Sequence, residues 1–230
     1  MRIAVISDIH SNLDAFEAVV NRLPNYDELV CLGDLVGYGP DPNEVIQKLQ
    51  ELRPTVVLKG NHDHAVVTGD VEDFTPHAAE AIEWTRRKIQ QTGSRYLASL
   101  NPSARIERGG TTLAFFHGSP RDPLSEYVYP GIPEGLARGL VEAAGAKVVL
   151  LGHTHVPMCY RFAGSLLANP GSVGQPRDGD YRASFATLTL SDGEVKFDVE
   201  RVEYDVDPVA DRILRSGLPR FLAERLYMGV

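Results

Sequence analysis

Five short apolar, β-branched runs constrain the fold of this chain more than any other feature. Gly, Asp or Asn stands within two residues of the end of each run, and together the runs predict buried strands over residues 3–6, 29–32, 56–58, 113–116 and 148–151. Helical patterns over residues 14–23 and 43–52 separate the first three runs. Because this alternation requires crossover connections, we expect an α/β fold with a largely parallel central sheet and helices outside it.

The segment from residue 70 to 101 has a helical pattern and no strand pattern. Thr75 suits a helix N-cap and Pro76 suits the first helical position, so we expect a helix that continues from residue 78 to Gly93. This segment is interpreted as a helical insertion. Two roles for it stay open: a lid that faces the substrate, and a simple cover for the sheet.

The second half of the chain mixes helix and strand patterns. A helix is expected over residues 133–144, and two short helices after Asp207. Alternating apolar and polar residues predict antiparallel strands over residues 158–162, 165–168, 184–190 and 195–202. Asp192-Gly193 is a hairpin signal between the last two. Residues 1–230 are therefore expected to form a single domain with a helical insertion at about 70–101.

Composition narrows the class of protein. The 230 residues are 43% hydrophobic and carry a net charge of −8, which disfavours extended nucleic acid as a partner. Cys31 and Cys159 lie in apolar runs, so we expect buried thiols in a reducing compartment rather than a disulfide. We find no signal-peptide pattern and no run approaching the roughly 20 apolar residues of a membrane span. We therefore expect a cytoplasmic protein with no membrane partner.

Side chains that can bind metal follow all five predicted strands, where loops converge on ligands in open α/β sheets. They are Asp8, His10, Asp34, Asn61, His62, Asp63, His117, His153 and His155. Each short motif alone also fits an ordinary turn, but five of them after five strands indicate one site. Carboxylate, amide and imidazole ligands suit manganese, iron, zinc, cobalt or nickel. The absence of cysteine from the set disfavours a closed structural zinc site.

The motifs D-x-H, G-D-x-x-G, G-N-H-D, a lone His and G-H-x-H occur in this order between Asp8 and His155. With this pattern, and with Asn169-Pro170-Gly171-Ser172, the chain resembles the calcineurin-like metallophosphoesterase superfamily, in particular its small bacterial and archaeal phosphodiesterases. The resemblance implies a four-layer αββα sandwich, with two mixed β-sheets flanked by helices.

The resemblance also implies two divalent metal ions, with manganese favoured over iron, zinc, nickel or cobalt. One ion would be held by Asp8, His10, Asp34 and His155, and the other by Asp34, Asn61, His117 and His153. Asp34 would bridge the two ions. A bridging hydroxide would then attack phosphorus in line, since a metal pair lowers the pKa of water to about 7.

Charge balance favours a small phosphodiester substrate. Two carboxylates, two divalent ions, one hydroxide and one phosphodiester sum to zero. A phosphomonoester, carried by a nucleotide or a phosphoprotein, would add a negative charge that Arg177 could meet. A phosphodiesterase is therefore our first hypothesis and a phosphomonoesterase the second. The third is a non-catalytic scaffold of the same fold, a class that tends to lose site histidines.

By the same resemblance, His62 would protonate the leaving oxygen, and Asp63 would orient His62 and keep it cationic. The expected substrate contacts are Asn61, His62 and Arg177. Asn169 and Ser172 would support the ligands from outside. We interpret three tyrosines as packing residues: Tyr38, Tyr127 and Tyr129. A homo-oligomer, formed through the insertion or the C-terminal helices, stays open.

Overall fold

The computed structural model describes residues 1–162, 164–191 and 194–230, and these contain two five-stranded mixed sheets. The order of the first sheet is β10-β9-β1-β2-β3. Its strands are β1 (Arg2–Ile6), β2 (Glu28–Cys31), β3 (Val56–Val57), β9 (Ala183–Ser191) and β10 (Glu194–Val202). Strands β1, β2 and β3 run parallel, because helices α1 (Leu13–Arg22) and α2 (Pro42–Glu51) make the crossovers.

Strands β9 and β10 pair antiparallel, as predicted. The hairpin turn predicted at Asp192-Gly193 lies outside the described residues.

The second sheet has the order β4-β5-β6-β8-β7. Its strands are β4 (Ser103–Arg108), β5 (Thr111–Phe116), β6 (Val148–Leu151), β7 (Met158–Phe162) and β8 (Ser165–Asn169). Strand β8 is antiparallel to β7, as predicted, but parallel to β6. The expectation of one largely parallel sheet is wrong, because the five motif-bearing strands divide between two sheets. The four-layer sandwich implied by the resemblance is confirmed.

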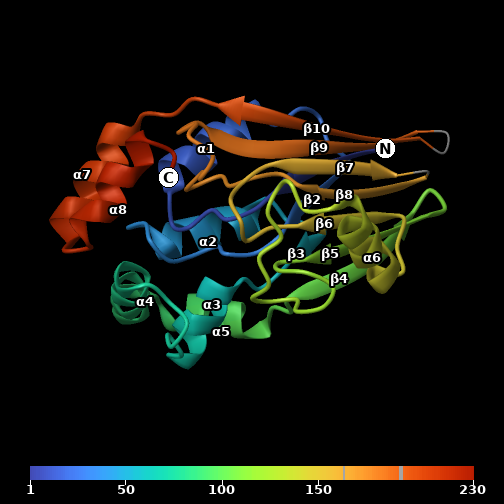
Figure 1. The fold of residues 1–230 in the computed structure, drawn as a ribbon. Coiled ribbons are helices and arrows are strands. Elements are labelled where there is room, and N and C mark those ends of the chain that lie inside the picture. The colour runs from blue at the N-terminus through green and yellow to red at the C-terminus, as the bar shows by residue number, and fades with distance from the viewer. Residues whose placement is uncertain (163, 192–193) are drawn as a thin grey trace.

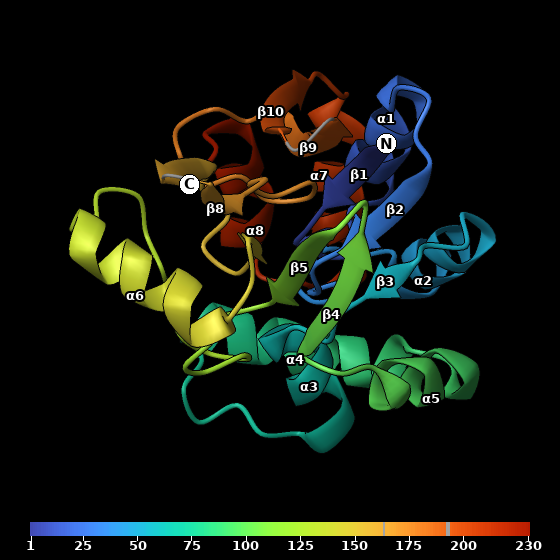
Figure 2. The same ribbon diagram turned by 90° about the vertical axis from the view of Figure 1, so that its right-hand side faces the viewer.

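The layers follow from the alternation of side chains along each strand. Ile3 and Val5 of β1 pack between the two sheets with Phe115 of β5, and all three are fully buried. Ala4 and Ile6, on the opposite face of β1, belong to the core under α1 and α2. Helix α6 (Glu134–Ala144) covers the outer face of the second sheet. Figure 2 shows α6 on one side, α1 and α2 on the other, and the strands between them.

The remaining helices gather at one end of the sandwich. They are α3 (Asn61–Thr68), α4 (Pro76–Lys88), α5 (Gln91–Ser99), α7 (Val206–Ser216), α8 (Arg220–Glu224) and the 3-10 helix η1 (Arg225–Tyr227). Trp84 of α4 packs with Ile213 of α7 and Leu222 of α8, and its Nε1 donates to the carbonyl oxygen of Ser216 at 2.9 Å. Figure 1 shows α4, α7 and α8 at the same end, far from the amino terminus.

The segment predicted as one helix up to Gly93 is two helices, and Gly93 lies inside the second one. Asn43 of α2 explains the break. Its Oδ1 accepts a hydrogen bond from the Gln90 amide at 2.8 Å, and its Nδ2 donates to the Lys88 carbonyl at 3.1 Å. These bonds hold the chain in an extended conformation between the two helices.

The sequence predicted that both cysteine thiols are free and buried. Both thiols are free, but only Cys31 is buried, whereas Cys159 is exposed. The prediction for Cys159 was wrong because this residue lies at an outward-facing position of edge strand β7.

The longest described helix, α4, has 13 residues, so none of the helices in the described ranges is long and apolar enough to cross a bilayer.

Candidate metal centre

The ends of the motif-bearing strands from both sheets meet in one place. Backbone hydrogen bonds join the loops that follow them: the amide of Asp8 donates to Gly33 at 2.9 Å, and the amide of His10 donates to Asp34 at 3.0 Å. Within the second sheet, the amide of Gly152 donates to the carbonyl oxygen of His117 at 3.0 Å. Between the sheets, the amide of Gly174, after β8, donates to the carbonyl oxygen of Asp8 at 3.0 Å. Side chains that are 145 residues apart along the chain are therefore brought into contact.

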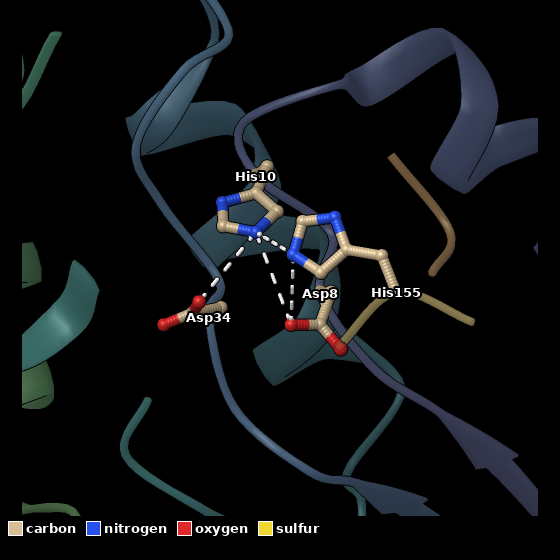
Figure 3. A group of neighbouring side chains, drawn as sticks. All are labelled: Asp8, His10, Asp34 and His155. Atoms are coloured by element: carbon tan, nitrogen blue, oxygen red, sulfur yellow. Dashed lines mark hydrogen bonds and ion pairs between the residues drawn. The ribbon is translucent and has the colours of Figure 1, made fainter. Parts of the chain in front are cut away.

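The first group of potential ligands consists of Asp8, His10, Asp34 and His155. All four are buried, and their donor atoms lie within 4.8 Å of one another. The two imidazole Nε2 atoms, of His10 and His155, are 3.0 Å apart. Asp34 Oδ2 lies 3.5 Å from His10 Nε2, and Asp8 Oδ1 lies 3.3 Å from His155 Nε2. Figure 3 shows the four side chains turned toward a common point.

A second group shares Asp34 with the first and adds His117 and His153, again within 4.8 Å. His117 Nε2 lies 3.4 Å from Asp34 Oδ2 and 3.1 Å from Asn61 Oδ1. Asn61 is thus placed beside this second group. All seven residues predicted as ligands come together, in two groups that have one carboxylate in common.

Hydrogen bonds to the backbone orient the ligand atoms inward. The Nδ1 atoms of His10, His117 and His155 face the carbonyl oxygens of Val36, Leu32 and Gln175 at 3.1, 2.8 and 2.5 Å. Because these carbonyls accept the Nδ1 protons, the Nε2 lone pairs are left for a cation. One oxygen of each carboxylate is also held, since Asp8 Oδ2 accepts from His153 N and Asp34 Oδ1 accepts from His62 N.

The other carboxylate oxygens, Asp8 Oδ1 and Asp34 Oδ2, are buried and have no hydrogen-bond partner among the described residues. They face the Nε2 atoms of His10 and His155; burial lowers the pKa of both imidazoles, which leaves an inward-directed lone pair on each. Opposed lone pairs at such distances repel, and a divalent ion between them would turn the repulsion into coordination. The residues present therefore fit a metal centre.

The backbone of the site is strained. Eight non-glycine residues of the described ranges have positive φ, and five of them are predicted ligands: Asp8, His10, Asp34, His153 and His155. This conformation costs a non-glycine residue about 1–2 kcal/mol, and it persists at functional sites where the surrounding structure enforces it. Gly60 is required here for close approach, since a Cβ at that position would lie 1.9 Å from Asp34 Oδ1.

The surroundings of Asp34 and His117 shift the pKa values of these two ligands in opposite directions. Burial would raise the pKa of Asp34, but His117 and His62 hold it well below its ordinary value. Burial opposes the charge on His117, yet Asp34 raises the pKa of His117 to about 9. Burial and His117 lower the pKa of His153 to about 3. In the metal-free site, Asp34 and His117 therefore form a charged pair.

Comparison with known proteins agrees with this site. The sequence pattern of the calcineurin-like phosphoesterase superfamily domain matches residues 1–193. The chain belongs to the calcineurin-like phosphoesterase superfamily.

Relatives of this metallophosphoesterase include an uncharacterized protein of Methanocaldococcus jannaschii, 36% identical over 99% of this chain and 98% of that protein. The crystal structure of a metallophosphoesterase from Sphaerobacter thermophilus is 37% identical, covers 100% of both chains and superposes with a TM-score of 0.85. A symmetrical bis(5'-nucleosyl)-tetraphosphatase of Yersinia pestis is 38% identical, but over only 36% of this chain and 35% of its own length.

His62 lies beside the metal centre of this metallophosphoesterase, as predicted from its motif position. Its ring centroid is 4.8 Å from that of His10 and 4.4 Å from that of Tyr38, and it lines the cavity described below. Gly37, with a φ of +92°, leaves room for the ring, since a Cβ there would lie 2.5 Å from His62 Nδ1.

The predicted role of Asp63 was wrong. Its carboxylate accepts hydrogen bonds from the backbone amides of Leu35, Val36 and Gly60 at 2.9, 3.1 and 2.9 Å. His62 Nδ1 has no hydrogen-bond partner among the described residues, and burial lowers the pKa of His62 to about 4. Asp63 therefore ties the loop after β2 to the start of α3, and it does not keep His62 cationic.

Asn169 and Ser172 contact the loops that carry the ligands. Asn169 Nδ2 donates to the Gly152 carbonyl at 2.7 Å and to Thr154 Oγ1 at 3.1 Å, so it fixes the turn around His153. Ser172 Oγ donates to the Asp8 carbonyl at 2.7 Å. Both side chains are fully buried and act on the ligands through the backbone.

A cavity of about 670 Å³ opens over the metal centre. Asn61, His62, His153 and Arg177 line it, and so do residues that no motif predicted, among them Thr75, His77, Tyr127, Phe221 and Arg225. The insertion thus contributes to the cavity wall through the start of α4. Its Trp84 packs with α7 and α8, whereas Ile82 and Leu97 belong to the core beside the first sheet.

The three tyrosines differ in their surroundings. Tyr38 is 8% exposed and is a packing residue, as expected. Tyr127 and Tyr129 are 48% and 50% exposed, so the packing interpretation was wrong for both. The Tyr127 ring stacks on His153, with centroids 3.8 Å apart, and on Tyr129 at 5.7 Å. Neither Tyr127 nor Arg225 carries a sequence signal, because each acquires its position only through the fold.

Proposed function

We propose that this metallophosphoesterase hydrolyses small phosphodiesters at a centre of two divalent metal ions. The observation that carries the proposal is the sharing of Asp34 by two buried ligand groups. Asp8, His10 and His155 would complete one metal site, and Asn61, His117 and His153 the other. When bound, two divalent ions would lower the pKa of a water molecule and withdraw charge from the phosphoryl oxygens. Manganese is the favoured ion for this mixed oxygen and nitrogen set.

The residues of the chain supply orientation and a proton. Asn61 and Arg177 line the cavity beside the centre and would bind phosphoryl oxygens. His62, buried at the cavity wall, would donate its proton to the leaving oxygen after the substrate's negative charge has raised the pKa of its imidazole. The stacked ring of Tyr127 would hold His153 in place from the solvent side.

The volume of the cavity and the net charge of the protein favour a small substrate. A cavity of about 670 Å³ is of the size that takes a nucleotide-like molecule, and the net charge of −8 disfavours long polyanions. The retention of every predicted metal ligand disfavours a purely structural role for the chain.

Hydrolysis of bis(4-nitrophenyl) phosphate by manganese-loaded protein tests the proposal. We expect nitrophenolate release that is abolished by a chelator and restored by manganese, and slower release from 4-nitrophenyl phosphate on the same preparation. Faster release from the monoester would make the protein a phosphomonoesterase. No turnover of either compound between mildly acidic and alkaline pH, by protein shown to contain metal, would contradict the proposal and favour a scaffold.

A further inference from the structure

Two arginines flank Tyr38 on one wall of the cavity. The guanidinium carbons of Arg177 and Arg225 each lie 5.7 Å from the centroid of the Tyr38 ring. Arg177 Nη2 donates to Tyr38 Oη and to Gln175 Oε1, both at 3.1 Å. Arg225 Nε donates to a backbone oxygen of Val230, the last residue of the sequence. Arg177 follows β8 and Arg225 begins η1, so the fold alone brings them together.

Neither guanidinium group forms an ion pair with an Asp or Glu side chain of the described residues. Arg212 of the neighbouring α7 provides the contrast, because it is paired with both Asp14 and Asp41. The buried Nε atom of Arg177 has no hydrogen-bond partner in the described ranges. Burial, together with the nearby charge of Arg177, lowers the pKa of Arg225 to about 10. Two half-buried guanidinium groups that no acidic side chain neutralises are a common setting for an anionic ligand.

The positions of the two arginines relative to the metal centre are different. The amide of Arg177 donates to the carbonyl oxygen of the ligand His155 at 3.3 Å, so Arg177 adjoins the metal centre directly. Arg225 interacts with Arg177 and Tyr38. The metal centre, Arg177 and Arg225 thus form a series along one cavity. The acidic residues of that cavity, Asp70 and Asp73, belong to the loop before α4.

We propose that Arg177 and Arg225 bind a second phosphate group of the substrate, separate from the phosphate that is hydrolysed. The preferred substrate class is then a small phosphodiester that also carries a terminal phosphate. This inference rests on the proposed function for the position of the scissile group. The second phosphate supplies negative charge that no acidic side chain provides to the arginine pair, and bidentate hydrogen bonds from guanidinium groups fit its oxygens.

A pair of matched substrates tests the proposal: thymidine 5'-(4-nitrophenyl phosphate), and the same compound with a 3'-phosphate. With manganese-loaded protein, the 3'-phosphate should raise kcat/KM about tenfold. In Arg225→Gln this gain should fall below about twofold, and Arg225→Lys should keep part of it. The matched control is Arg220→Gln, which removes an equal charge from α8 at a side chain that is 81% exposed and paired with Glu224. It should keep the full gain.

A binding measurement without metal separates this inference from the proposed function. Calorimetric titration of metal-free protein should show thymidine 3',5'-bisphosphate binding more tightly than thymidine 5'-monophosphate, with the difference lost in Arg225→Gln. Equal affinity for the two ligands, or equal kcat/KM for the two substrates, would overturn the second phosphate site. Absence of nitrophenolate release from both substrates, with tight binding of the bisphosphate, would overturn the proposed function alone.

Discussion

The floor and the wall of the cavity are built in different ways. The floor consists of the seven potential metal ligands, which are largely buried and are held by the backbone. The wall, made of Tyr38, Tyr127, Arg177, Phe221 and Arg225, comes from segments without a common motif, and Tyr127 and Phe221 are 48% and 42% exposed. In the proposed function, the floor would determine which reaction is possible, and the wall would select the substrate.

This difference has a physical origin. Metal ligands must be positioned to a fraction of an ångström, and the ends of buried strands provide that rigidity. Substrate selection needs only complementary charge and shape, which exposed loops and short helices can supply and vary. Substitutions in the floor should therefore abolish activity, and substitutions in the wall should change which substrates are hydrolysed.

The strongest test of the floor is Asp34→Asn, because Asp34 belongs to both ligand groups. Loss of several kcal/mol of transition-state stabilisation should lower kcat/KM for bis(4-nitrophenyl) phosphate by about 10³-fold or more. Metal content, measured by mass spectrometry, should fall by at least one ion per chain. The control, Asp211→Asn, alters an exposed aspartate of α7 and should change neither quantity. Full metal content in Asp34→Asn would contradict the bridging role of Asp34.

His62 lies between floor and wall, so His62→Asn separates proton transfer from metal binding. We expect kcat/KM to fall about 10²-fold for a diester with an alkyl leaving group. The loss should be much smaller for 4-nitrophenolate, which leaves without a proton. Metal content should stay at the wild-type level. An equal loss for both leaving groups would show that His62 is not the acid.

The pH dependence of metal binding tests the charged pair in the floor. With a pKa of about 9 in the metal-free site, His117 is protonated at pH 7 and must lose its proton to bind a metal ion. Apparent affinity for manganese should thus rise by about tenfold per pH unit from pH 7 and level off above pH 9. Calorimetry in buffers of different ionisation enthalpy should show release of about one proton at pH 7. Constant affinity over this range would contradict the pairing of His117 with Asp34.

Substitutions in the wall should have the smallest effects. Tyr127→Ala removes the ring that stacks on His153 and should raise KM about threefold, with kcat nearly unchanged. Tyr129→Ala is the matched control, since Tyr129 is equally exposed and stacks on Tyr127 only. Its KM should stay within experimental error of the wild type. A large fall in kcat for Tyr127→Ala, with loss of metal, would place Tyr127 in the floor instead.

The sequence predicted the floor better than the wall. Ligands such as Asp8 and His155 stand next to strand ends in short motifs, so local pattern was sufficient to find them. Strand β4 was missed because only Ala104 and Ile106 in it are apolar, and α3 because Asn61-His62-Asp63 was interpreted as a loop. Arg225 could not be predicted, since only the packing of α8 against α7 brings it to the cavity.

The division of five strands between two sheets was also hidden from local patterns. The run at 113–116 has the same apolar, β-branched or aromatic character as the run at 29–32, yet the two belong to different sheets. Pairing partners depend on long-range register, which a single sequence does not display. The hydrogen bonds that Asp63 accepts from the amides of Leu35 and Val36 were also unpredictable, because these amides lie 28 and 27 residues away along the chain.

Anomalous diffraction from a manganese-soaked crystal tests the shared carboxylate most directly. We predict two metal peaks about 3.5–4 Å apart, one next to Asp8 and His155, the other next to His117 and His153, with Asp34 touching both. A single peak, or a second ion bound away from Asp34, would contradict the account.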